Sequence, residues 1–84
     1  MDFSICMAHI IPPRIPKAFP NLVKVKAKGN RRRWKDKETG EIYEWDYRHG
    51  RLEKYSSDGK HLGEFDPETG RQTKKASPER TVEK

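Results

Sequence analysis

The chain has few of the residues that build disulfides and metal sites. It holds one cysteine, Cys6, so it can form neither an intrachain disulfide nor a cysteine-based metal site. Its three histidines, His9, His49 and His61, do not have the spacing of zinc ligands. We therefore predict that the protein binds no metal and no cofactor.

Long apolar segments are also missing. No stretch is long enough to span a membrane. The N-terminal stretch is broken by Pro12 and Pro13 and lacks the basic start and apolar middle of a secretory signal. We expect a monomer without a membrane anchor. Its export from the cell would require a route other than a secretory signal of its own.

Apolar residues make up 31% of the 84 residues, and a chain of this size buries only about 60% of its unfolded surface. The core must be thin, and the eight aromatic residues must supply much of it. Six of the eight fall between Trp34 and Phe65, where we place the core.

Positive charge is concentrated in the first half of the chain. Residues 1–40 hold ten Lys/Arg and three Asp/Glu, whereas residues 41–84 hold nine and ten. The total of +6 favours a polyanionic partner, although a solvated basic tail would have the same composition.

Turn residues divide the chain into short strands. Four prolines interrupt residues 1–30, which we interpret as a Pro-rich basic leader, irregular or with a short helical turn over residues 2–10. Within it, residues 21–28 alternate Val and Ala with Lys, as an edge strand does. Residues 31–84 form the folded domain, with a polar tail from Ala76 that we expect to be loosely ordered. Further strands are predicted over residues 31–36, 41–47, 51–55, 61–65 and 71–75.

The predicted fold class is therefore mainly β, a small, highly twisted antiparallel meander. The turns DKETG and DPETG resemble a repeat, but both are explained by turn chemistry, with glycine where a positive φ is needed.

One bend gathers residues that can carry chemistry. Alternation puts Tyr43 and Trp45 on one face of their strand and Asp46 on the other. If this strand pairs with the next, Asp46 and Glu53 come close and His49 lies at the rim between them. Two carboxylates and an imidazole beside cations can act as the acid and base of metal-free RNA cleavage, with an arginine on the phosphate.

Each of these residues also has a structural interpretation. His49 before Gly50 can be a turn residue, Asp46 can cap that turn, and Glu53 can form a surface ion pair. His61, which follows a turn and starts a strand, is interpreted as structural.

Basic residues interleaved with an aromatic residue form a second signal. The strip Lys24 to Lys35 contains seven Lys/Arg and no acidic residue, so we expect it to grip RNA phosphates without doing chemistry. Trp34 within it is assigned to the thin core rather than to base stacking. The expected RNA-binding residues are Arg31, Arg32, Arg33, Lys35, Lys54, Tyr55 and Lys60.

Residues 31–74 contain a series of motifs in a fixed order: a basic run with Trp, then IYEWD, HG, LE, Y, SDG, HLG, FDP and TG. This order resembles the cytotoxic domain of the ribosome-inactivating colicins and cloacin. The resemblance implies a twisted antiparallel sheet and a metal-independent ribonuclease that cuts 16S ribosomal RNA at the decoding site. It implies Glu53 as general base, His49 as general acid and Asp46 as the residue that orients His49. Arg80 falls, in a divergent stretch, where the family has an arginine that assists at the phosphate.

The resemblance further implies two partners, the 30S ribosomal subunit and a small acidic immunity protein. It implies delivery from a producing bacterium into the cytoplasm of a target bacterium. The residues alone also allow a noncatalytic RNA- or ribosome-binding module, or a structural tail of a larger secreted protein.

Overall fold

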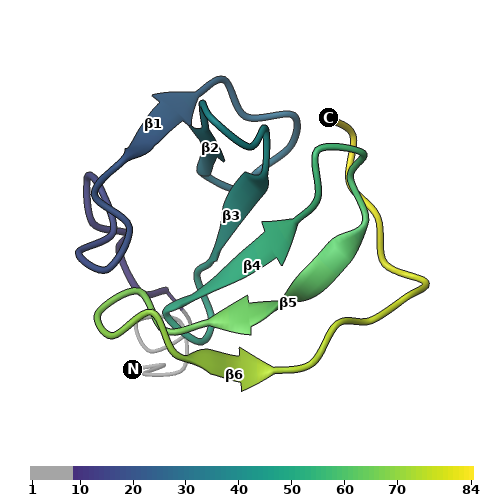
Figure 1. The fold of residues 1–84 in the computed structure, drawn as a ribbon. Coiled ribbons are helices and arrows are strands. Elements are labelled where there is room, and N and C mark those ends of the chain that lie inside the picture. Colours follow the sequence, from purple (N-terminus) through teal and green to yellow (C-terminus); the bar gives the residue numbers. More distant parts are fainter. Residues whose placement is uncertain (1–8) are drawn as a thin grey trace.

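Six short strands follow one another along the chain and pair in the same order. In the computed structural model, which describes residues 9–84, they are β1 (Leu22–Val25), β2 (Arg33–Asp36), β3 (Ile42–Asp46), β4 (Arg51–Tyr55), β5 (His61–Phe65) and β6 (Gln72–Lys74). Each strand is antiparallel to the next, and the sheet curves strongly from β1 at the top to β6 at the bottom (Figure 1). The predicted antiparallel meander is confirmed.

Three of the turns are built in the same way, from an aspartate and a glycine four residues later. In the turns that begin at Asp36, Asp46 and Asp66, the carboxylate Oδ1 accepts hydrogen bonds from the N–H groups two and three residues on. The closing glycine has a φ between 65° and 78°, and its N–H donates to the carbonyl of the aspartate. A left-handed φ suits glycine, which explains the likeness of DKETG and DPETG as turn chemistry. The third turn is D46YRHG50, so His49 lies in a turn of defined shape.

One face of the sheet carries the hydrophobic core. Leu22, Trp34, Tyr43, Trp45 and Leu52 form the buried cluster. Trp34 and Trp45 meet edge to face, with ring centroids 6.3 Å apart, and Trp34 is fully buried. The assignment of Trp34 to the core is confirmed.

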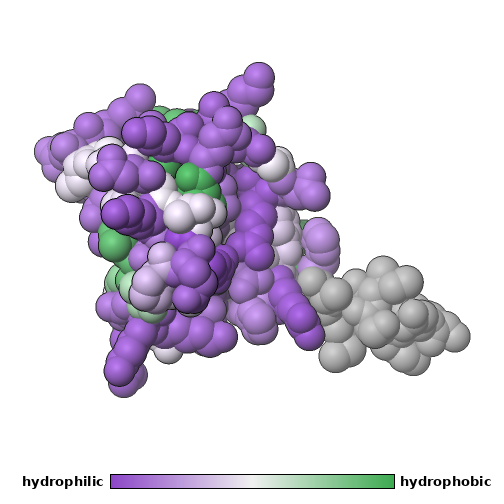
Figure 2. Space-filling view, turned by 90° about the vertical axis from the view of Figure 1, so that its right-hand side faces the viewer, coloured by the Kyte–Doolittle hydropathy of each residue, from purple (hydrophilic) through white to green (hydrophobic). Residues whose placement is uncertain are grey.

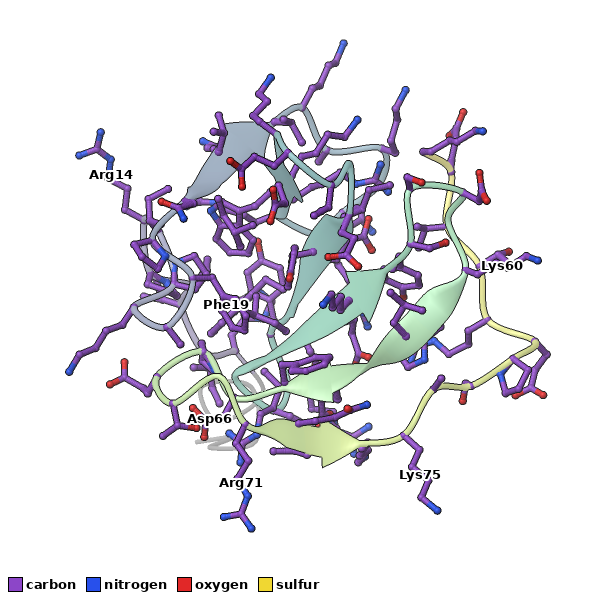
Figure 3. The ribbon with its side chains drawn as sticks, in the orientation of Figure 1. Arg14, Phe19, Lys60, Asp66, Arg71 and Lys75 are labelled. Atoms are coloured by element: carbon purple, nitrogen blue, oxygen red, sulfur yellow. The ribbon has the colours of Figure 1, made fainter. Side chains whose placement is uncertain are left out.

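An N-terminal segment, residues 9–21, covers this core. The indole of Trp45 donates to the carbonyl of Ile10 (2.7 Å), and that of Trp34 donates to the carbonyl of Arg14 (3.0 Å). Phe19 points inward and packs between the rings of Tyr43 and Phe65, whereas Arg14 points away from the sheet (Figure 3). Most of the predicted helical turn over residues 2–10 lies outside the described residues, and His9 and Ile10 are not helical.

The opposite face carries charged side chains such as Glu53 and Glu64. The C-terminal tail, residues 75–84, runs from the end of β6 past β5 to the turn between β4 and β5 (Figure 1), and its residues Ser77 and Arg80 lie beside these carboxylates. The sequence predicts that the part of this tail from Ala76 onward is loosely ordered. Instead, Lys60 and Thr81 form an isolated bridge, the N–H of Val82 donates to the carbonyl of Gly59, and the N–H of His61 donates to the carbonyl of Arg80. The tail's polar composition did not reveal these contacts, since they use backbone groups.

The surface seen from the side of this tail is almost entirely hydrophilic, with only small hydrophobic spots (Figure 2). No helix within residues 9–84 is long and apolar enough to cross a membrane.

Candidate active site

A row of charged residues crosses the sheet on the face opposite the core. Strand register places Arg33 opposite Glu44, Glu44 opposite Glu53, Glu53 opposite Glu64, and Glu64 opposite Lys74. The three glutamates are buried, and like charges placed opposite each other destabilise a sheet. Each of the three carboxylates is therefore expected to need its own hydrogen-bond or ion-pair partner.

Glu44 at the β2 side of the row is neutralised by Arg33. Its Oε2 accepts from both Nε (3.0 Å) and Nη2 (2.7 Å) of the guanidinium, and both side chains are almost fully buried. At the other side of the row, Glu64 accepts a hydrogen bond of 2.6 Å from the hydroxyl of Thr73.

Glu53, in the middle of the row, is held by His61. The ring Nε2 of His61 lies 2.7 Å from Glu53 Oε1, and its Nδ1 accepts the N–H of Ser77 at 2.9 Å. Since Nδ1 is an acceptor, the neutral ring carries its proton on Nε2 and donates it to Glu53. His61 is 5% exposed, so this contact is shielded from water.

Arg80 reaches the same carboxylate from the tail. Its Nη1 lies 3.5 Å from Glu53 Oε1, and its Nη2 donates to the Tyr55 hydroxyl at 3.1 Å. Burial raises the pKa of Tyr55 in spite of the nearby guanidinium, so the hydroxyl is neutral when it accepts this bond. The guanidinium remains partly exposed and can receive an anion.

The tail position depends on Gly59, which predicts a measurable effect of a single methyl group. Gly59 has a φ of 87°, and a Cβ at this position would overlap the carbonyl oxygen of Val82. We expect Gly59→Ala to displace the tail and Arg80. The variant should lose most of the RNA cleavage expected from the sequence, while the free energy of unfolding of the sheet changes little. Urea unfolding and activity of Gly59→Ala, with Ser57→Ala in the same turn as control, test this. Full activity in Gly59→Ala would contradict the dependence of Arg80 on the docked tail.

His49 is oriented by Asp46 through the turn they share. Its Nδ1 lies 2.7 Å from Asp46 Oδ2, and the other oxygen of Asp46 accepts the N–H groups of Arg48 and His49. Burial alone would raise the pKa of Asp46, but the hydrogen bonds from the His49 ring and the two backbone groups lower it below its ordinary value. A carboxylate on Nδ1 leaves Nε2 as the ring nitrogen available for proton transfer.

These groups surround one hollow of about 270 Å³, which we name the carboxylate hollow. It is lined by Arg31, Asp46, His49, Glu53, His61, Glu64, Lys74, Lys75, Ser77 and Arg80. Of the four residues proposed for catalysis from the sequence, all four line it. A hollow with two oriented carboxylates, one half-exposed imidazole and guanidinium groups can bind a phosphate and exchange protons with its neighbours.

The expected RNA-binding residues lie in several places. Arg31 lines the carboxylate hollow. Tyr55 does not line it, but its hydroxyl accepts a hydrogen bond from Arg80, which does. Arg32, Lys35 and Lys60 lie outside the hollow. Arg33 is buried against Glu44, and Lys54 lies on the core face, 5.7 and 5.3 Å from the ring centroids of Tyr43 and Phe65. Neither Arg33 nor Lys54 therefore shares a surface with Arg31.

Sequence reasoning missed Glu64 and the contact of His61. In a regular strand, residues 61 and 64 would face opposite sides. An irregularity in the pairing of β4 with β5 leaves Leu62 without an opposite residue and brings both side chains to the same face. The one sequence signal for this contact was the position of His61 at the start of the strand that follows the SSDG turn, where the hairpin pairs it with Tyr55.

The same hollow contains a set of possible metal ligands. Asp46, His49 and Glu64 each bring one donor atom within 4.8 Å of the others. One imidazole and two carboxylates form an acceptable ligand set for a transition metal, which the spacing of the histidines in the sequence did not indicate.

Comparison with known proteins decides the family. The sequence profile of a family described as Cytotoxic matches residues 12–83. The chain belongs to the cytotoxic domain family. Three Escherichia coli proteins are similar to it: colicin E3, 47% identical over 75 residues; cloacin, 53% over 57; and colicin E6, 51% over 57.

These alignments cover 88%, 67% and 67% of the chain but only 13%, 10% and 10% of the relatives. The chain thus spans only about a tenth of the length of these three proteins. The resemblance to the colicin and cloacin cytotoxic domain, inferred from the motifs of residues 31–74, is confirmed.

Proposed function

We propose that this cytotoxic domain is a metal-independent endoribonuclease that cleaves 16S ribosomal RNA at the decoding site and so halts translation. The observation that carries the proposal is the carboxylate hollow, where Glu53, His49 and Arg80 meet in a basic protein. The similarity to colicin E3 and cloacin supports this substrate, because the motifs of residues 31–74 resemble the cytotoxic domain of the ribosome-inactivating colicins.

Glu53 acts as the general base. Its Oε1 is occupied by His61 and Arg80, which fix the carboxylate in place, and Oε2 takes the proton from a ribose 2′-hydroxyl. The 2′-oxygen then forms a bond to the adjacent phosphorus, and the bond from phosphorus to the 5′-oxygen breaks. The products are a 2′,3′-cyclic phosphate and a free 5′-hydroxyl.

His49 acts as the general acid and donates its Nε2 proton to the departing 5′-oxygen. Asp46 holds the ring by Nδ1 and stabilises the imidazolium before the transfer. Arg80 and Arg31 stabilise the negative charge that builds on the phosphate oxygens. His61 is a positioning residue, since it acts through Glu53.

Two partners follow from this function. The domain binds the 30S subunit of a target bacterium after delivery into its cytoplasm from the producing cell. A small acidic immunity protein protects the producer by covering the basic surface, since acidic side chains complement the same cations as RNA phosphates do.

Intact ribosomes provide the decisive test, with and without chelator. We expect one new small fragment of 16S RNA, formed equally fast in excess EDTA when polyamines keep the ribosomes intact. Binding without cleavage would indicate a noncatalytic module, and neither would indicate a structural segment. Loss of cleavage in EDTA, restored by one metal, would replace the proposed mechanism by one in which Asp46, His49 and Glu64 are ligands.

The exposed lysines Lys24, Lys26 and Lys28 provide a separate test of binding to the RNA phosphate backbone. They lie outside the carboxylate hollow, unlike Arg31, and are not buried, unlike Arg33. Replacing them with Gln should weaken ribosome binding. The slope of log K against log salt should fall by about 0.7–0.9 for each RNA phosphate that the variant no longer neutralises.

Single-turnover cleavage by this lysine variant at saturation should remain normal, because the hollow is untouched. An unchanged salt slope would contradict the gripping role of these lysines.

A further inference from the structure

A second hollow adjoins the site and has no role in the mechanism above. It has a volume of about 420 Å³ and is lined by His9, Asn30, Arg31, Asp46, Tyr47 and Arg48. We name it the stacking hollow. Arg31 and Asp46 also line the carboxylate hollow, so the two spaces are neighbours with a common wall.

One wall of the stacking hollow is a pair of aromatic rings. The imidazole of His9 lies on the ring of Tyr47, with centroids 4.8 Å apart and an angle of 31° between the planes. Tyr47 is half-buried against the core, whereas His9 is exposed, so His9 is the outer ring of the pair. A further flat ring can extend this stack.

The fold holds this ring pair in place through backbone contacts. The N–H of Ile10 donates to the carbonyl of Tyr47 at 2.7 Å, and the carbonyl of Ile10 accepts the indole N–H of Trp45 at 2.7 Å. His9 is therefore attached to the end of β3 directly beside the turn of His49. The stack is fixed relative to the residues proposed for catalysis.

The remaining walls provide the polar groups that a nucleotide needs. The exposed amide of Asn30 can donate to and accept from the edge of a base. The guanidinium groups of Arg31 and the exposed Arg48 match phosphate oxygens. An aromatic platform, an amide and two guanidinium groups around one space together fit a ribonucleotide better than an apolar or cationic ligand.

We propose that the stacking hollow is a subsite for the ribonucleotide next to the scissile phosphate, with its base stacked on His9 and its own further phosphate on Arg48, while Arg31 in the common wall contacts the scissile phosphate. The assignment rests on the proposed function for the position of the scissile phosphate. Its consequence is that substrate binding uses at least two nucleotide positions, one in each hollow.

Uncleavable probes test the subsite without any catalysis. A 2′-O-methyl adenosine 3′-phosphate and the corresponding 2′-O-methyl dinucleotide, extended by a second nucleotide with its own 3′-phosphate, cannot react, because the attacking oxygen is blocked. In NMR titrations we expect the dinucleotide to bind more tightly and to shift the ring signals of His9 and the side-chain amide of Asn30. We call the ratio of the mononucleotide Kd to the dinucleotide Kd the affinity gain. In His9→Ala this affinity gain should fall by about 5- to 150-fold, the effect of removing one base–aromatic stack.

Matched variants distinguish the effects of ring stacking and of charge from a nonspecific disturbance of the fold. Tyr47→Phe keeps the ring pair and should keep the gain, whereas Tyr47→Leu should lose it. Arg48→Gln should weaken the dinucleotide more than Arg71→Gln, which removes the same charge from a side chain that points into solvent outside both hollows (Figure 3).

Two results would overturn the subsite: a dinucleotide that binds wild type no more tightly than the mononucleotide, or a gain that survives in His9→Ala. Failure of the proposed function looks different. In that case wild type leaves ribosomal RNA intact while the His9-dependent gain persists, and the stacking hollow is a nucleotide site of a noncatalytic protein.

Discussion

Glu53→Gln should lower single-turnover cleavage of 16S RNA by about 10²–10⁴-fold, the usual contribution of a general acid or base. The amide fills the same space and still accepts the hydrogen bond from His61, but it cannot take a proton. His49→Ala should reduce the rate to a similar extent, since it removes the proton donor from a half-exposed position that the core does not need.

The matched control is Glu68→Gln, which changes an exposed carboxylate in the turn between β5 and β6. Thermal unfolding should show the same Tm for all three variants within a few degrees, which separates impaired chemistry from impaired structure. A His49→Ala variant that cleaves at nearly the wild-type rate would show that another group protonates the leaving oxygen.

Arg33→Met should destabilise the fold by about 3–5 kcal/mol, because it leaves the carboxylate of Glu44 buried without its partner. The double variant Arg33→Met with Glu44→Leu should recover most of this stability, since both buried charges are then absent. Urea unfolding measures both, and Lys26→Met serves as an exposed control.

The double variant also tests the expectation that Arg33 contacts RNA. If its role is only to pair with Glu44, ribosome binding by the folded double variant keeps the wild-type salt dependence. A reduced salt slope would show that the guanidinium leaves its buried position to meet a phosphate.

The strands were predictable because their boundaries are local. Each lies between turn residues such as Asp36 and Gly40, and the alternation of Tyr43 and Trp45 with Glu44 and Asp46 separates the core face from the charged face. The grouping of Asp46, His49 and Glu53 was predictable for the same reason, since one tight turn joins their strands.

The other residues of the site depend on information that local patterns do not contain. Arg33 is one of three consecutive arginines, and only its register opposite Glu44 buries it. His61 and Glu64 reach the same face because of the irregular pairing between β4 and β5. Arg80 arrives through a tail whose contacts are made by backbone groups of residues such as Gly59, which have no signature in composition.

The meander and the tail differ in how they resist local unfolding. Each strand is joined to its sequence neighbour by a ladder, whereas the tail is attached to the turn between β4 and β5 by a few backbone hydrogen bonds. Segments with few buried contacts open at lower free energy than the rest of a domain. Opening of the tail withdraws Arg80 from Glu53 and the Ser77 N–H from His61 while all six strands stay paired. If Arg80 and Glu53 act as proposed, opening of residues 75–84 yields a folded sheet that does not cleave RNA, so the docking of this tail would set the active fraction at a given temperature.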